Sequence, residues 1–150
     1  MTVKILQIGR SNIGNNHPPF IIAEMSGNHN HSLDRALAIV EAAAQAGAHA
    51  IKLQTYTADT MTLDIAEGEF FISDRNSLWN GQSLYDLYKQ AHTPWEWHAP
   101  IMKQAEELGL ICFSTPFDRP LLSFLKPCMC MRTRSYQLNS VIFDRDIRDP

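Results

Sequence analysis

The sequence contains few cysteines, no long hydrophobic run and no excess of positive charge, and each absence excludes a class of protein. Its three cysteines are an odd number and do not suggest a disulfide framework. No apolar run approaches the roughly 18 residues that a membrane span needs. Residues 1–16 contain no hydrophobic segment of a secretory signal, which predicts a cytoplasmic protein without membrane association. The net charge of −3 argues against a nucleic-acid-binding surface.

The composition is that of a globular protein in which charge is unevenly distributed. Hydrophobic residues make up 45% of the 150 residues and charged residues 19%, which is typical of a folded domain. Residues 1–118 carry 7 Lys and Arg against 13 Asp and Glu, whereas residues 119–150 carry 6 against 3. This shift predicts a boundary near residue 119. The segment 119–150 is then either a fourth strand–helix unit or a divergent, frameshifted segment.

Short apolar runs alternate with helical patterns along the chain. Strands are predicted at 20–25, 48–56 and 110–115, a further strand at 136–140, and helices at 33–45, 84–89 and 121–126. Ser32 is expected to cap the helix at 33–45, and Gly47 lies where a helix-ending glycine belongs. The apolar stripe of that helix is predicted to be Leu33, Leu37, Val40 and Ala44.

A further helix is predicted to begin at Thr93 and to end at Gly109. Thr93 is a suitable N-cap, Pro94 fits the first helical position and Glu96 completes a capping box. Pro100 contradicts a straight helix, because it removes a backbone donor, and predicts a kink or a late start. The expected apolar stripe is Trp97, Ile101, Ala105 and Leu108.

Strands that alternate with helices indicate an α/β fold with a parallel sheet and right-handed crossovers. Both a doubly wound sheet and a TIM barrel fit this order of elements. A typical barrel needs about 250 residues, so this chain would supply about half of one.

Polar residues follow the predicted strands at the edge where α/β folds bind ligands. Lys52 stands out, because a lysine within an apolar strand needs an anionic partner. That partner is either a ligand phosphate or carboxylate, or Glu24 in a structural ion pair. Gln54 shares the face of Lys52, as a ligand-binding amide or as a satisfied polar core residue.

Metal and phosphate motifs are weak or absent. The segment Asn28-His29-Asn30-His31 lacks a carboxylate or cysteine at ligand spacing, so capping and loop hydrogen bonds are the preferred interpretation. Cys128 and Cys130 do not form a CxxC pattern, and the sequence contains no GxGxxG or GxxxxGK.

Four segments resemble the sialic acid synthase family: FIIAEMSGNHNHSL, GAHAIKLQTYTADTMTL, LWNGQSLYDLYKQAHTPWEWH and LGLICFSTPFD. The resemblance covers about residues 15–118, and the third segment favours the pseudaminic acid synthases within that family. It implies a TIM (β/α)8 barrel, of which this chain would be an incomplete N-terminal portion of about three to four β–α units.

The resemblance also implies a reaction. Phosphoenolpyruvate would condense with an acetamido sugar, 2,4-diacetamido-2,4,6-trideoxy-altrose, to give a nonulosonic acid and phosphate. A divalent metal, Mn²⁺ or Mg²⁺, would polarise the sugar aldehyde, and its histidine ligands are not in this chain. A homodimer is implied, in which a C-terminal antifreeze-like domain covers the partner's active site.

The resemblance assigns roles to six residues. It implies a catalytic role near the reacting carbons for Glu24, phosphoenolpyruvate binding by Lys52, Thr115 and Ser140, and sugar binding by Gln54 and Asn80.

The sequence departs from the family pattern at its end. Gln137 replaces a second phosphate-binding lysine, and the expected glutamate after Ser140 is missing. An alternative interpretation is therefore a truncated, catalytically inactive remnant that lacks the metal site and the C-terminal domain.

Overall fold

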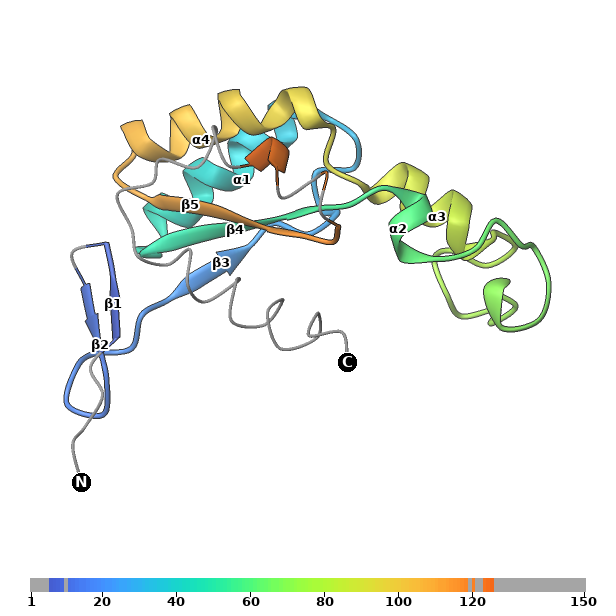
Figure 1. Cartoon of the computed structure of the whole chain (residues 1–150), viewed down its shortest axis with the longest axis horizontal. Coiled ribbons are helices and arrows are strands. Elements are labelled where there is room, and N and C mark those ends of the chain that lie inside the picture. The colour runs from blue at the N-terminus through green and yellow to red at the C-terminus, as the bar shows by residue number, and fades with distance from the viewer. Residues whose placement is uncertain (1–5, 10, 119, 121–122, 126–150) are drawn as a thin grey trace, which may run out of the picture.

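The computed structural model describes residues 6–9, 11–118, 120 and 123–125 (Figure 1). The predicted strand at 136–140 lies outside the described residues, as does nearly all of the segment 119–150. Of the predicted helix at 121–126, residues 123–125 are described and are helical. The elements in chain order are β1 (Leu6–Ile8), β2 (Ser11–Ile13), β3 (Ile22–Glu24), α1 (Leu33–Gln45), β4 (Ala50–Thr55), α2 (Ala58–Met61), η1 (Gly68–Phe70), α3 (Leu84–Ala91), η2 (Trp95–Trp97), α4 (His98–Glu107) and β5 (Ile111–Pro116).

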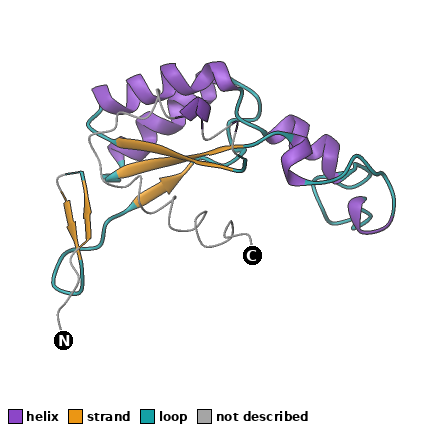
Figure 2. Cartoon of the chain, viewed as in Figure 1, coloured by secondary structure: helices purple, strands orange, loops and turns teal. Residues whose placement is uncertain are grey.

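The centre of the fold is a parallel sheet in the order β3-β4-β5. Helices α1 and α4 lie over one face of this sheet, and no helix of the described chain covers the other (Figures 1 and 2). The α/β class and the parallel sheet are thus as predicted. The closed barrel stays a prediction, because the described sheet has three strands.

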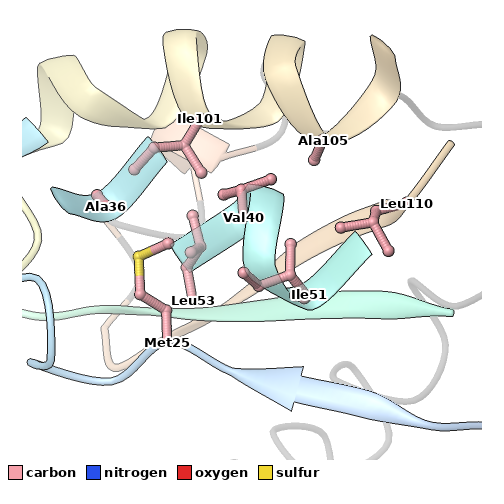
Figure 3. Packing of buried hydrophobic residues seen from close by; sticks show 9 residues of the cluster. Met25, Ala36, Val40, Ile51, Leu53, Ile101, Ala105 and Leu110 are labelled. Atoms are coloured by element: carbon pink, nitrogen blue, oxygen red, sulfur yellow. The ribbon is translucent and has the colours of Figure 1, made fainter. Parts of the chain in front are cut away.

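The hydrophobic core lies between the sheet and these two helices. Ile51 and Leu53 of β4 point toward α1 and α4, where they meet Val40 and Ile101 (Figure 3). All four side chains are fully buried. Burial of such side chains stabilises the fold by about 1.5–3 kcal/mol each.

Helix α1 begins and ends as its sequence predicts. The Ser32 hydroxyl accepts a hydrogen bond from the Arg35 amide at 3.3 Å, which satisfies one of the free donors of the first turn. Gly47 follows the helix with φ of +78°, a conformation that favours glycine. The buried stripe differs from the prediction, because Leu33, Leu37 and Ala44 are only partly buried. Its centre is Ala36, Val40 and Ala43.

Helix α4 starts later than its capping pattern predicts. The short 3₁₀ turn η2 comes first, and α4 begins at His98, without a side-chain cap. Pro100 is then in the first turn, where the missing N–H breaks no helical hydrogen bond. The prediction of Thr93 as N-cap is wrong, since its hydroxyl lies 3.3 Å from His29 Nε2. The assignment of Leu108 to the buried stripe is also wrong, because it is 44% exposed.

Two parts of the structure were not predicted. Strands β1 and β2 form an antiparallel hairpin ahead of the parallel sheet. Between β4 and α4, the chain makes α2, η1 and α3, of which only α3 was expected. This long crossover extends away from the sheet beyond the carboxyl end of β4 (Figure 1). No helix in the described part of the chain combines the length and apolarity needed to cross a bilayer.

Candidate functional site

Three of the predicted site residues meet on the face of the sheet opposite α1 and α4. Lys52 Nζ lies 2.6 Å from Glu24 Oε2. The Gln54 side-chain amide donates to the other oxygen, Glu24 Oε1, at 3.3 Å. The carboxylate of β3 is therefore held by two neighbouring side chains of β4, one cationic and one neutral.

Strand register explains why these residues meet. Glu24 pairs with Lys52, and Gln54 pairs with Thr115 of β5. Paired residues of a parallel sheet lie on the same face, and side chains alternate along each strand. Thr115 therefore shares the face of Lys52 and Gln54, and Phe113 lies beside Lys52. The prediction that Lys52 and Gln54 share one face of the sheet is confirmed.

Both charged groups remain accessible to solvent. The side chains of Lys52 and Glu24 are 30% and 40% exposed. Of the two interpretations of Lys52, the ion pair with Glu24 is the contact present in the structure. A partly exposed pair contributes at most about 1 kcal/mol to stability. An ammonium group has three donors, so the pair does not prevent Lys52 from binding an anion.

The structure does not bring Asn80 into this group. Its backbone N–H donates to the Ser77 carbonyl at 3.2 Å, in the loop before α3, which lies beyond α2 and α3 from the sheet (Figure 1). No hydrogen bond between Asn80 and Glu24, Lys52 or Gln54 is found within the described chain. Its sugar-binding role stays a prediction. Ser140 lies outside the described residues.

The histidine-containing loop after β3 is held by its own hydrogen bonds, as preferred from the sequence. His29 is fully buried, and its Nδ1 accepts from the His31 amide at 3.1 Å. Because Nδ1 is an acceptor, Nε2 carries the proton and faces the Thr93 hydroxyl. Burial, with smaller contributions from His31 and His92, lowers the pKa of His29.

The described residues do not gather into a metal centre. Nowhere in residues 6–9, 11–118, 120 and 123–125 do three His, Cys, Asp or Glu side chains gather as a metal site would require. Glu24 is engaged by Lys52 and Gln54. The described residues therefore do not fit the divalent metal that the resemblance implies.

Sequence analysis missed a buried polar group on the covered face. Thr55, His98 and Ser114 are all fully buried and form a continuous chain of hydrogen bonds. No local pattern signals this chain, because its members come from β4, α4 and β5. The only hint is that polar residues end two otherwise apolar strands.

Two other ionisable groups near the strands stay protonated. Burial raises the pKa of Tyr56, at the end of β4, to about 12, with a smaller contribution from Tyr88. Burial also raises the pKa of the Cys112 thiol to about 12. A thiolate is the reactive form of cysteine, so neither group supplies a nucleophile or base at neutral pH.

Comparison with known proteins gives a consistent result. Residues 39–142 match the NeuB family, a match that extends into the segment predicted to be divergent. The chain is 46% identical over 121 residues to pseudaminic acid synthase of Campylobacter jejuni, which covers 81% of this chain and 34% of that protein. It is 43% identical over 113 residues to pseudaminic acid synthase of Helicobacter pylori, covering 75% and 33%.

A solved structure shares the fold. The N-acetylneuraminic acid synthetase of Leptospira borgpetersenii superposes with a TM-score of 0.68 at 29% identity, over 84% of this chain and 39% of that one. The chain thus spans about a third of the length of the curated relatives that it matches.

Proposed function

Because the chain belongs to the NeuB family, we propose that it forms part of a synthase that condenses phosphoenolpyruvate with an open-chain acetamido sugar. The products are a nonulosonic acid and phosphate. The observation that carries this proposal is the Glu24–Lys52–Gln54 group on the open face of the parallel sheet, where Glu24 ends β3 and Gln54 lies next to the end of β4. Such strand ends are where α/β folds place their ligands.

Lys52 is the residue that binds the phosphoenolpyruvate anion. It is the cation of the group, it is 30% exposed, and its strand fixes its position. A fixed cation stabilises an anionic ligand without reorganisation. Thr115 lies on the same face, and its hydroxyl is the neighbouring donor for the phosphate. Ser140 is assigned to the same anion on the basis of family resemblance alone.

Glu24 lies beside the reacting carbons. In the condensation, C3 of phosphoenolpyruvate attacks the sugar aldehyde, water adds at C2, and phosphate leaves. The Lys52 ammonium and the Gln54 amide orient the two oxygens of Glu24. Gln54 presents its amide to the sugar, and Asn80 is the second sugar-binding residue in this proposal.

A divalent metal, Mn²⁺ or Mg²⁺, belongs to the family resemblance. Since the described residues do not fit a metal site, no step of the condensation is assigned to one.

The pseudaminic acid synthases among the relatives favour 2,4-diacetamido-2,4,6-trideoxy-altrose as the sugar. The TIM barrel, the homodimer and the cytoplasmic location are parts of the same proposal. No described helix suits a membrane span.

Calorimetric titration with phosphoenolpyruvate, followed by an assay of phosphate release with manganese and the sugar, tests the proposal. The protein is expected to bind phosphoenolpyruvate and to release phosphate only when the sugar is present. Lys52→Met should weaken binding by about tenfold to a hundredfold, the effect of losing one charged hydrogen bond.

Lys103→Met is the matched control, because Lys103 is a largely exposed lysine on α4. It should bind phosphoenolpyruvate as the unaltered protein does. Equal binding by all three proteins would overturn the role of Lys52. A folded protein that neither binds phosphoenolpyruvate nor releases phosphate would support the inactive alternative.

A further inference from the structure

Three buried polar side chains lie on the covered face of the sheet, directly behind the candidate site. Thr55 Oγ1 lies 2.7 Å from His98 Nε2 and 2.5 Å from Ser114 Oγ. Each hydroxyl belongs to a direct neighbour of a site residue, since Thr55 follows Gln54 and Ser114 precedes Thr115. Successive side chains of a strand point to opposite faces, so the two groups share a backbone but not a surface.

The direction of each hydrogen bond follows from the acceptors around His98. Its Nδ1 lies 3.2 Å from the Pro94 carbonyl and 3.1 Å from the Trp95 carbonyl. Carbonyls only accept, so Nδ1 carries the proton and Nε2 accepts from the Thr55 hydroxyl. Thr55 has one hydroxyl proton, and Ser114 must therefore donate to Thr55. Burial lowers the pKa of His98, which agrees with a neutral ring.

Residues 93–98, which include His98 and the two carbonyls, also contact the loop that follows β3. The Thr93 hydroxyl lies 3.3 Å from His29 Nε2. The Trp97 ring meets the His29 ring edge-on, with centroids 5.4 Å apart. Residues 93–98 thus contact His29 in the loop after β3 and Thr55 at the end of β4. They reach Ser114 of β5 through the Thr55 hydroxyl.

We propose that residues 93–98, which we name the strand-end clamp, position the site residues on the opposite face of the sheet. His98 is its central positioning residue. It acts through the hydroxyls of Thr55 and Ser114 on the positions of their neighbours Gln54 and Thr115. The effect on catalysis rests on the proposed function, whereas the effect on the strand ends does not.

Hydrogen bonding is suited to this role in a way that apolar packing is not. Hydrophobic burial is non-directional. An apolar residue in place of Thr55 or His98 would therefore fill the space without fixing the positions of the strand ends relative to one another. A fully satisfied buried network favours one arrangement of its members. Misplacement of a reacting group by 1 Å can reduce a rate by about a hundredfold.

The test compares variants of similar size. Thr55→Val keeps the shape and removes the hydroxyl, and Thr55→Ser restores the hydroxyl. Ser114→Ala is a second, smaller break in the chain of hydrogen bonds. Ile101→Val is the matched control, because Ile101 is fully buried in α4 and the substitution loosens packing without removing a hydrogen bond.

Amide hydrogen exchange measures how well the hydrogen bonds at the strand ends are protected, and it needs no ligand. The probes are the Met25 amide, which donates to the Lys52 carbonyl at 3.0 Å, and the Phe117 amide, which donates to the Thr55 carbonyl at 3.2 Å. Thr55→Val and Ser114→Ala should accelerate exchange of the Phe117 amide by about tenfold relative to Ile101→Val. Thr55→Ser should restore slow exchange. Equal exchange in Thr55→Val and Ile101→Val would overturn the proposal.

Sugar-dependent phosphate release gives the second readout. Thr55→Val should lower kcat/KM by about tenfold to a hundredfold, while Ile101→Val and Thr55→Ser stay within about twofold. Equal loss in Thr55→Val and Ile101→Val would show a merely structural role. If the unaltered protein releases no phosphate, the proposed function fails, and the amide exchange still decides whether the strand-end clamp holds the strands.

Discussion

The two faces of β4 carry different chemistry on one backbone. Ile51 and Leu53 are fully buried against α1 and α4, whereas Lys52 and Gln54, which alternate with them, contact the carboxylate of Glu24. The covered face stabilises the fold, and the open face holds the candidate site. Substitutions at adjacent positions should therefore affect different properties, and four measurements test that separation.

The largest expected effect is on the covered face. Leu53→Ala should lower the free energy of unfolding by about 2–5 kcal/mol, because it removes buried methylene groups and leaves a cavity. Gln54→Ala is the neighbouring control on the open face and should change it by less than about 1 kcal/mol. Urea unfolding measures both. Similar losses in the two variants would contradict the difference between the faces.

On the open face, Glu24→Gln should separate binding from turnover. Removal of the carboxylate leaves Lys52 without its anionic partner, so phosphoenolpyruvate should bind about fivefold more tightly, as expected for about 1 kcal/mol of charge interaction. Phosphate release should nevertheless fall by at least about tenfold, because the group beside the reacting carbons is lost. Calorimetry and the phosphate assay measure the two effects.

Glu107→Gln is the matched control, since Glu107 forms an exposed pair with Lys103 on α4. Weaker phosphoenolpyruvate binding in Glu24→Gln would show that the carboxylate helps to hold the anion, contrary to this prediction.

The buried histidines predict a loss of stability as the pH falls. Burial lowers the pKa of both His29 and His98 from the ordinary value of 6.5, so the unfolded chain takes up protons that the folded protein does not. The free energy of unfolding is therefore highest above about pH 6.5 and declines below it, by up to about 1.4 kcal/mol per pH unit for each ring. His31 and His92 add to this decline at His29. The Trp95 and Pro94 carbonyls, and to a smaller extent Glu96, oppose it at His98.

Urea unfolding between about pH 7 and about pH 5.5 measures this decline. His29→Gln and His98→Gln should each reduce the slope, and Ile101→Val, which keeps both rings, should not. An unchanged slope in both glutamine variants would show that other groups cause the pH dependence.

The smallest effect is expected on the solvent side of α4. Lys103 Nζ lies 3.8 Å from Glu107 Oε1, and the two side chains are 78% and 64% exposed. Lys103→Ala should change the free energy of unfolding by less than about 0.5 kcal/mol. Thermal unfolding at low and high salt measures it. A change in the free energy of unfolding as large as that of Leu53→Ala would show that this exposed pair stabilises the fold, contrary to the prediction.

Local sequence signals predicted the elements that depend on local chemistry. The Ser32 cap, the φ of Gly47 and the alternation along β4 each depend on neighbouring residues, and each is confirmed. The meeting of Lys52 with Gln54 on one face followed from the two-residue repeat of a strand. The parallel pairing followed from the alternation of strands and helices.

Long-range contacts account for what the sequence did not reveal. Thr93 has every local feature of an N-cap, yet its hydroxyl contacts His29, 64 positions away. His98 carries no motif, and its partner Thr55 is 43 positions away. The hairpin of β1 and β2 was not predicted, although Gly9, with φ of +60°, follows β1 directly and glycine is typical of a two-residue hairpin turn. The catalytic and binding roles of all six predicted site residues stay predictions, and those of Thr115, Ser140 and Asn80 rest on resemblance.

The two connections between the parallel strands differ greatly in length. Residues 25–49 join β3 to β4 through α1, whereas residues 56–110 join β4 to β5 through α2, η1, α3, η2 and α4. The entropy of closing a loop grows only with the logarithm of its length, so the longer connection costs the fold about 0.7 kcal/mol more. Residues between α2 and α3 can therefore change in number and kind while the strand pairing stays the same. Relatives that act on different sugars would be expected to differ first in this segment.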